Sequence, residues 1–125
     1  KGMELAYKAV DIVQAKVANH PIENIILGIF CGLLMFIAVT VYEQKPWMTV
    51  MCVAAFILAG FNHCIADMFY FFTARMFTAE VFLFLAIVVL GNTVGGIFIP
   101  AIMLVSIVLF YVLYAVVAKK AVKRK

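Results

Sequence analysis

Three long apolar runs, separated by short polar segments, dominate the hydrophobic pattern of the chain. They contain no Asp, Glu, Lys or Arg, and they cover residues 24–42, 46–66 and 81–118. Each run meets the length of about 20 residues that a helix needs to cross about 30 Å of hydrocarbon. The pattern therefore predicts an all-α integral membrane protein with three transmembrane helices, at about residues 22–42, 47–72 and 81–105, the last with a helical extension to residue 118.

Polar segments flank this three-span domain, which we place at residues 21–118. The first sixteen residues, KGMELAYKAVDIVQAK, carry charges throughout and lack the apolar core of a signal peptide. Their apolar positions loosely follow helical spacing, which predicts an amphipathic surface helix. We therefore expect residues 1–20 to form an external segment that leads into the first span, and residues 119–125 to form a basic tail.

Composition and charge fit a membrane location. The chain is 68% hydrophobic with a mean hydropathy of +1.18, beyond the values usual for soluble domains. A net charge of +4 would suit a nucleic-acid partner, but five of the ten basic residues lie in the tail after the last span. The positive-inside rule favours a cytoplasmic flank instead. We expect a multi-pass protein of the plasma or inner membrane with its C-terminus inside, residues 1–20 and 73–80 outside, and no nucleic-acid partner.

Small and polar residues mark special points in each span. Gly28 and Gly32 in the first span form a GxxxG pair, which allows another helix to approach closely. Glycine and asparagine are poor helix formers, so the second span is expected to be interrupted at Gly60–His63. The third run would be about 57 Å long as one helix at 1.5 Å per residue, and LGNTVGGIFIP, residues 90–100, is where we expect irregular backbone.

Asn62, His63 and Asp67 are polar residues at a depth where they are costly. His63 and Asp67 are four residues apart, so on a continuous helix they would share a face and could form a hydrogen bond. One interpretation is a structural clip that holds the broken helix together. The other is that His63 lines a permeation path and Asp67 or a backbone group orients it. Histidine suits an anion because its ring donates hydrogen bonds and holds or passes on a proton near neutral pH.

Other kinds of site receive little support. Cys31, Cys52 and Cys64 form no CxxC pair, and a metal site at His63, Cys64 and Asp67 would need another ligand. A bis-histidine haem would need a partner for His63 at similar depth, whereas His20 lies at the membrane edge. No Ser-His-Asp set, phosphate loop or paired carboxylates suggest catalysis. We therefore expect no metal, no cofactor and no enzymatic activity.

Three segments carry a resemblance to a known family. GFNHCIADMF in the second span is similar to the G-F-E-H-S/C-I-A-N-M signature of the formate–nitrite transporter family, GNTVGG in the third span resembles that family's sixth span, and Lys16 followed by PIENIILGI resembles the entry to its fourth. The chain thus resembles the C-terminal half of such a transporter. The resemblance implies half of a six-span, aquaporin-like inverted-repeat protomer, which needs an N-terminal half of three further spans and assembles as a homopentamer in the lipid bilayer.

The resemblance also implies roles for individual residues. His63 would be the pore histidine on an interrupted span and Asn92 the asparagine near it. Phe56 would belong to the inner apolar constriction, Met35 to the outer one, and Lys16 would attract anions at the external vestibule. Asn62, Cys64 and Asp67 would support the histidine.

Three positions depart from the family pattern. Asn62 replaces a glutamate, Asp67 replaces an asparagine, and Gly32 stands where formate-type members have a pore asparagine. The implied function is a channel or transporter for a small monovalent anion, with hydrosulfide favoured over formate and nitrite because Gly32 brings no amide to the pore. The alternative is a non-transporting three-span subunit that anchors or assembles a membrane complex.

Overall fold

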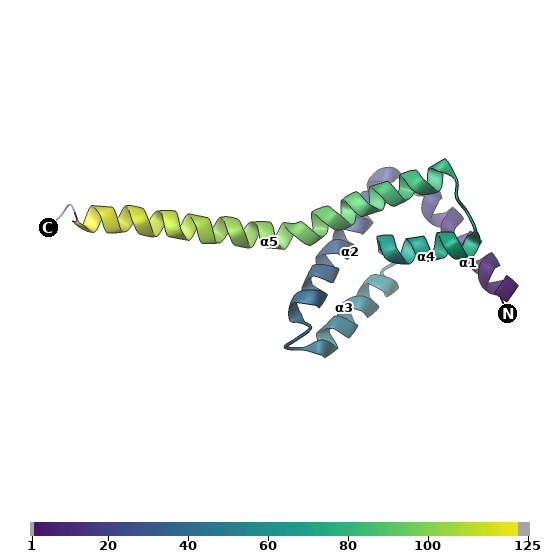
Figure 1. Ribbon diagram of the computed structural model, residues 1–125, viewed down its shortest axis with the longest axis horizontal. Helices are drawn as coiled ribbons and strands as arrows, with labels where there is room; N and C mark the ends of the chain where they lie inside the picture. The colour runs from purple at the N-terminus through teal and green to yellow at the C-terminus, as the bar shows by residue number, and fades with distance from the viewer. Residues whose placement is uncertain (1, 123–125) are drawn as a thin grey trace.

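The computed structural model describes residues 2–122 of the chain, and the last three residues of the predicted basic tail lie outside them. Within this range the chain folds into five helices (Figure 1): α1 Gly2–Ala18, α2 Pro21–Val41, α3 Pro46–Leu58, α4 Cys64–Ala74 and α5 Ala79–Val122. The predicted all-α class is confirmed. Helix α2 and residues 79–117 of α5 are long and apolar enough to cross a bilayer, while α3 and α4 are shorter apolar helices.

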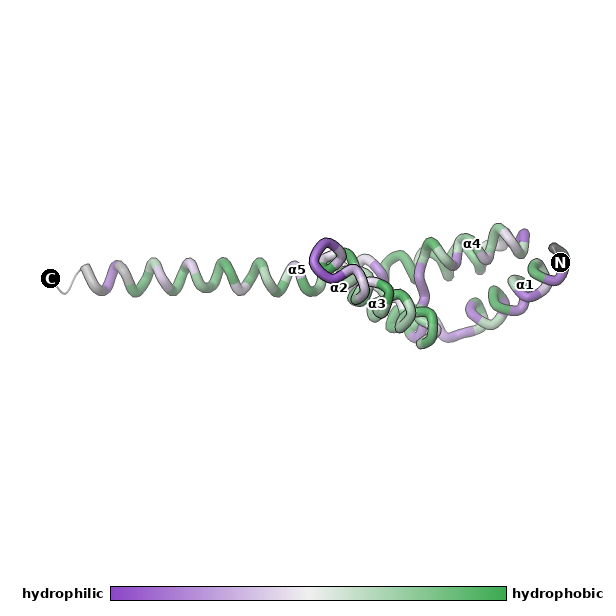
Figure 2. Tube along the Cα trace, turned by 90° about the horizontal axis from the view of Figure 1, so that it is seen from below, coloured by the Kyte–Doolittle hydropathy of each residue, from purple (hydrophilic) through white to green (hydrophobic). Residues whose placement is uncertain are grey.

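Local sequence signals set where α2 and α3 begin. Pro21 and Pro46 each occupy the first turn of their helix, where the missing N–H costs little. His20 caps α2, because its Nδ1 accepts a hydrogen bond from the backbone N–H of Ile22 at 3.3 Å. Between the two helices, the hydrophilic turn at residues 42–45 stands out in Figure 2 against largely apolar helices.

The predicted interruption at Gly60–His63 is found between two shorter apolar helices, while their joint role as one membrane span stays a prediction. Helix α3 ends at Leu58, and α4 begins at Cys64. In between, Gly60 adopts a φ of +69°, a left-handed conformation that glycine reaches without steric cost. His63 then takes an extended conformation and caps α4, with Nδ1 accepting from the N–H of Ala66 at 3.4 Å. We call residues 59–63 the break.

The expectation of irregular backbone at residues 90–100 is wrong. Helix α5 runs without interruption from Ala79 to Val122 and includes Pro100. Figure 1 shows a change of direction near the midpoint of α5, where Pro100 falls in the sequence, as expected for a proline that removes one helical hydrogen bond. Beyond this point residues 101–117 are exposed and project away from the other helices (Figure 1).

The glycines of α5 serve close packing against α2 instead of breaking the helix. A Cβ at Gly28 would lie 3.2 Å from Gly91 Cα, and one at Gly95 would lie 3.0 Å from Leu33 N and collide with Ile29 O. The close approach expected from the GxxxG pair is therefore confirmed, and it brings the backbones of two candidate spans into direct contact.

Replacing Gly95 by alanine should separate α2 from α5. The new methyl group would meet backbone atoms of α2 that cannot rotate away, and overpacking of this kind costs about 1–3 kcal/mol. Gly96→Ala is the matched control, since the nearest atom to a Cβ there, Gly32 O, is 4.0 Å away. Thermal unfolding in detergent should show a lower Tm for Gly95→Ala alone. Equal Tm values for the two variants would contradict the packing described here.

Helix α1 packs its apolar face against α4 and α5. Val13 is fully buried in a cluster with side chains of those two helices, namely Phe71, Val81, Phe84 and Val88. The opposite face carries Glu4 and Lys8, an exposed i,i+4 ion pair of 3.5 Å. One side of α1 is thus buried against α4 and α5, while Met3, Leu5 and Tyr7 are exposed, and its role as an amphipathic external segment stays a prediction.

Candidate functional site

Asn92 joins the three helices that meet at the break. Its Nδ2 donates to the carbonyl oxygens of Gly28 at 3.0 Å and Asn62 at 2.8 Å. Its Oδ1 accepts from the backbone N–H of Cys64 at 3.1 Å. The break leaves backbone groups without helical partners, and such groups need hydrogen bonds away from water. One side chain from α5 supplies two of them and also holds α2.

A second set of polar side chains connects α1 to the break. The ammonium of Lys16 donates to Asn62 Oδ1 at 2.7 Å and lies 2.9 Å from Asp67 Oδ1, in an ion pair. Asn62 Nδ2 donates in turn to Asn24 Oδ1 at 2.9 Å. The Asp67 side chain is 1% exposed and that of Lys16 is 19% exposed. This ion pair therefore lies in the interior, where removal of either partner is far more costly than at a surface.

The predicted hydrogen bond between His63 and Asp67 is not the arrangement found. Because the helix is broken at His63, the two residues are the cap and the first turn of α4, and the His63 ring turns back onto the N–H of Ala66. Asp67 pairs with Lys16 instead. A structural clip does exist, but it joins α4 to α1.

The hydrogen bond by which His63 caps α4 determines which ring nitrogen carries the hydrogen. A ring nitrogen that accepts a hydrogen bond carries no hydrogen, so in neutral His63 the hydrogen lies on Nε2. Among the described residues Nε2 makes no hydrogen bond. His63 is partly buried and offers one N–H donor beside the break.

Phe56 lies against His63, and its place in an inner apolar constriction stays a prediction. The two rings are stacked with centroids 5.5 Å apart and an interplanar angle of 27°. Phe56 comes from α3, on the other side of the break from α4, so this contact bridges the interruption. Met35 on α2 is partly buried, and its place in an outer constriction stays a prediction.

Gly32 lies in the close helix contact that the GxxxG pair predicted, whereas the partners of Lys16 were not foreseen from the sequence. Gly32 is buried in the α2–α5 contact, where a Cβ would lie 2.9 Å from Gly96 N and collide with Asn92 O. Helix packing therefore leaves no room for a side chain at this position. Lys16 is engaged by Asn62 and Asp67, so an anion in a vestibule would meet an ammonium that already has a counter-charge.

Asn24 is a site residue that sequence reasoning missed. It is 2% exposed, accepts from Asn62 and donates to the carbonyl oxygens of Lys16 and Asn19, each at 3.4 Å. The signal was present in the sequence, because Asn24 is an amide in the first turns of an apolar run.

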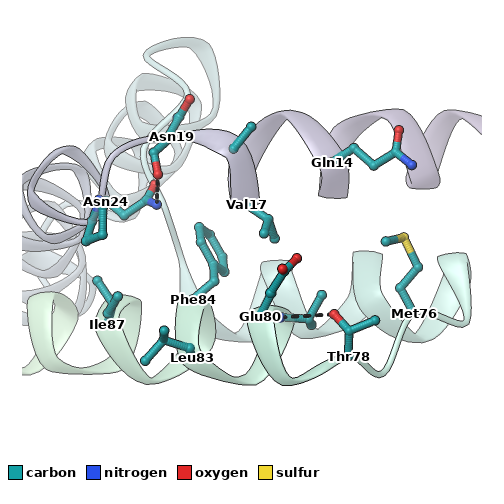
Figure 3. Close-up of a pocket in the computed structure, with 13 residues that line it drawn as sticks. Gln14, Val17, Asn19, Asn24, Met76, Thr78, Glu80, Leu83, Phe84 and Ile87 are labelled. Carbon is teal, nitrogen blue, oxygen red and sulfur yellow. Dashed lines mark hydrogen bonds between the residues drawn. The ribbon is translucent and has the colours of Figure 1, made fainter.

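A cavity beside this network does not include His63 in its lining. It has a volume of about 510 Å³ and lies between the end of α1, the start of α2 and the start of α5. Figure 3 shows Asn24 at one end and Gln14 and Met76 at the other, with Phe84 and Val17 between them. Asn24 thus lines the cavity and also bonds to Asn62 of the break, but the candidate site remains the break, where the polar groups converge.

The described residues contain no cluster of metal-ligating side chains and no disulfide. No group of three or more His, Cys, Asp and Glu side chains within the described part of the chain is placed to hold a metal ion. Cys31, Cys52 and Cys64 are free thiols.

Comparison with known proteins gives a family match. The family model for the formate/nitrite transporters matches residues 2–106, which include helices α1 to α4, the first part of α5 and every candidate residue of the break. No curated protein and no solved structure matches the chain.

Proposed function

Because the chain belongs to the formate/nitrite transporter family, we propose that it forms part of a membrane channel for a small monovalent anion with His63 in the anion's path. The observation that carries the proposal is a partly buried histidine at a break between two apolar helices. His63 caps α4 and stacks on Phe56, and Asn92 bonds to the backbone of the break. Non-helical backbone in hydrocarbon is tolerated only where protein or a wet cavity surrounds it. Because unpaired backbone groups are costly there, the presence of a break favours a functional role for it.

His63 Nε2 is the group proposed to meet the anion. The first N–H groups of α4 are already engaged, since Cys64 N–H bonds to Asn92 and Ala66 N–H bonds to His63. The positive end of the helix dipole still lies at the break and favours negative charge there. An anion would accept a hydrogen bond from Nε2, and transfer of a proton from the imidazolium form of His63 to the anion would leave a neutral imidazole and let a neutral acid leave.

Protonation of His63 is coupled to the cap of α4 in this proposal. In the imidazolium both ring nitrogens carry hydrogen, so Nδ1 can no longer accept from Ala66 N–H. The cation therefore loses the cap that the neutral ring provides.

Hydrosulfide is our favoured substrate, with formate and nitrite as the other candidates. Gly32 brings no amide to the pore, and the α2–α5 contact leaves no space for one. A small, weakly hydrated anion of a weak acid needs fewer polar partners than a carboxylate. Phe56 and, as predicted, Met35 would then form the apolar constrictions on either side of His63.

The proposed pore needs a second half. Leu58 and Ile65, on either side of the break, are 87% and 69% exposed, and a Cβ at Gly60 would have no neighbour within 4 Å. We propose that three further spans cover this surface, that five such protomers assemble, and that the basic end of α5 lies in the cytoplasm.

Flux measurements in liposomes test the proposal. The chain, co-reconstituted with an N-terminal three-span half, should conduct hydrosulfide, formate or nitrite, whereas the chain alone should not. The buried clip of Lys16 and Asp67 favours the second candidate, a non-transporting assembly subunit, to the extent that it stabilises the fold. Stable assembly of both halves without flux of any of the three anions would favour that subunit and contradict the channel.

A further inference from the structure

Lys16 contacts two side chains of the broken span, and only one of them is charged. The same Nζ is 2.7 Å from Asn62 Oδ1 and 2.9 Å from Asp67 Oδ1. Asn62 and Asp67 are each 1% exposed. We call these three residues the Lys16 cluster. One ammonium and one carboxylate are enclosed together, so the cluster has no net charge.

Resting on the proposed function, we propose that Asp67 is a positioning residue that fixes the break beside His63, and that the Lys16 cluster requires one carboxylate, which position 62 or position 67 can supply. A second carboxylate would be buried without a counter-charge, and the loss of the only one would leave the ammonium unpaired. Both states are costly in the interior. A single carboxylate at either position leaves the total charge unchanged.

The geometry permits the exchange. Asn62 Oδ1 and Asp67 Oδ1 both face Nζ, so an oxygen acceptor is needed at each position but a charge at only one. Asn24 accepts from Asn62 at present, and rotation of its own amide would let it donate to an aspartate there, in place of its two long bonds to the carbonyl oxygens of Lys16 and Asn19. Neither Asp67 oxygen has a hydrogen-bond partner among the described residues apart from the ion-pair contact of Oδ1 with Lys16, so an amide at 67 would lose only that ion pair.

The thiol of Cys64, next to His63, reports on the break without any transported anion. We would replace Cys31 and Cys52 by alanine in the full chain and measure the rate of maleimide labelling of Cys64 in membranes of expressing cells. Asn62→Asp and Asp67→Asn, each alone, should speed labelling at least about tenfold because the break loosens. The double variant Asn62→Asp/Asp67→Asn should label within about twofold of the parent, and Asp11→Asn, an exposed change on α1, should label like the parent.

A double variant that labels as fast as the worse single variant, or an Asp67→Asn variant that labels like the parent, would overturn the proposal. Where a single variant fails to accumulate in the membrane, accumulation of the double variant supports the exchange, and its failure overturns it. Because no anion is involved, a restored break without flux would contradict only the proposed channel.

Discussion

Replacing Asn92 by leucine should detach the break from α2 and α5 and abolish any flux. Leucine branches at Cγ as asparagine does and has a higher helix propensity, so α5 itself should persist. Three backbone groups lose their partner, the carbonyls of Gly28 and Asn62 and the N–H of Cys64. At about 1 kcal/mol or more for each buried unsatisfied group, the expected loss of unfolding free energy is about 3 kcal/mol. Thermal unfolding of the purified protein in detergent measures it.

Thr93→Val provides the control for this variant. Thr93 is the next residue of α5, is exposed, and bonds only to Val89 O of its own helix. Its replacement should change the unfolding free energy by less than about 0.5 kcal/mol. If Asn92→Leu unfolded at the same temperature as Thr93→Val, Asn92 would not be the residue that joins these helices.

Replacing His63 by asparagine should separate the two roles assigned to the histidine. Asparagine is among the preferred residues for capping a helix, so α4 should keep its first turn. Its amide cannot bind and release a proton at neutral pH. Loss of a hydrogen bond to a charged partner is worth about 1.5–3 kcal/mol, so flux should fall at least about tenfold, while the Tm stays close to that of the parent.

His63→Leu should lose both roles. Leucine cannot accept from the N–H of Ala66, and the loss of a cap costs about 1 kcal/mol, so this variant should show a lower Tm as well as a lower flux. If asparagine destabilised the protein as much as leucine, the capping role of His63 would be wrong. The comparison thus distinguishes a structural histidine from one that acts on the anion.

The sequence predicted those features that depend on local chemistry. The interruption at Gly60–His63 was predictable, because the conformational freedom of glycine acts within a few residues. The pairing of Lys16 with Asp67 could not be predicted this way, since it depends on how α1 packs against α4. Periodicity does not encode that packing.

The same distinction explains the error in the third apolar run. Three glycines and an asparagine close together suggested irregular backbone in residues 90–100. The same kind of reasoning, from one glycine and one asparagine, was correct at Gly60–His63. In α5, however, Gly91 and Gly95 are buried against backbone atoms of α2 and the amide of Asn92 bonds outward. Contact with a neighbouring helix outweighed the low helix propensity of these residues. The composition of the segment did not reveal whether helix packing or low helix propensity would determine its conformation.

The pH dependence of anion flux tests the central claim that His63 exchanges a proton with the transported anion. Flux of formate or nitrite, which stay ionised throughout, should be measured between about pH 5 and 8, where imidazoles titrate. Liposomes that contain the parent protein and its N-terminal half should show a flux that changes across this range, and liposomes that contain His63→Asn should show a small flux that does not. An equal flux with the same pH profile in both would contradict the role given to His63.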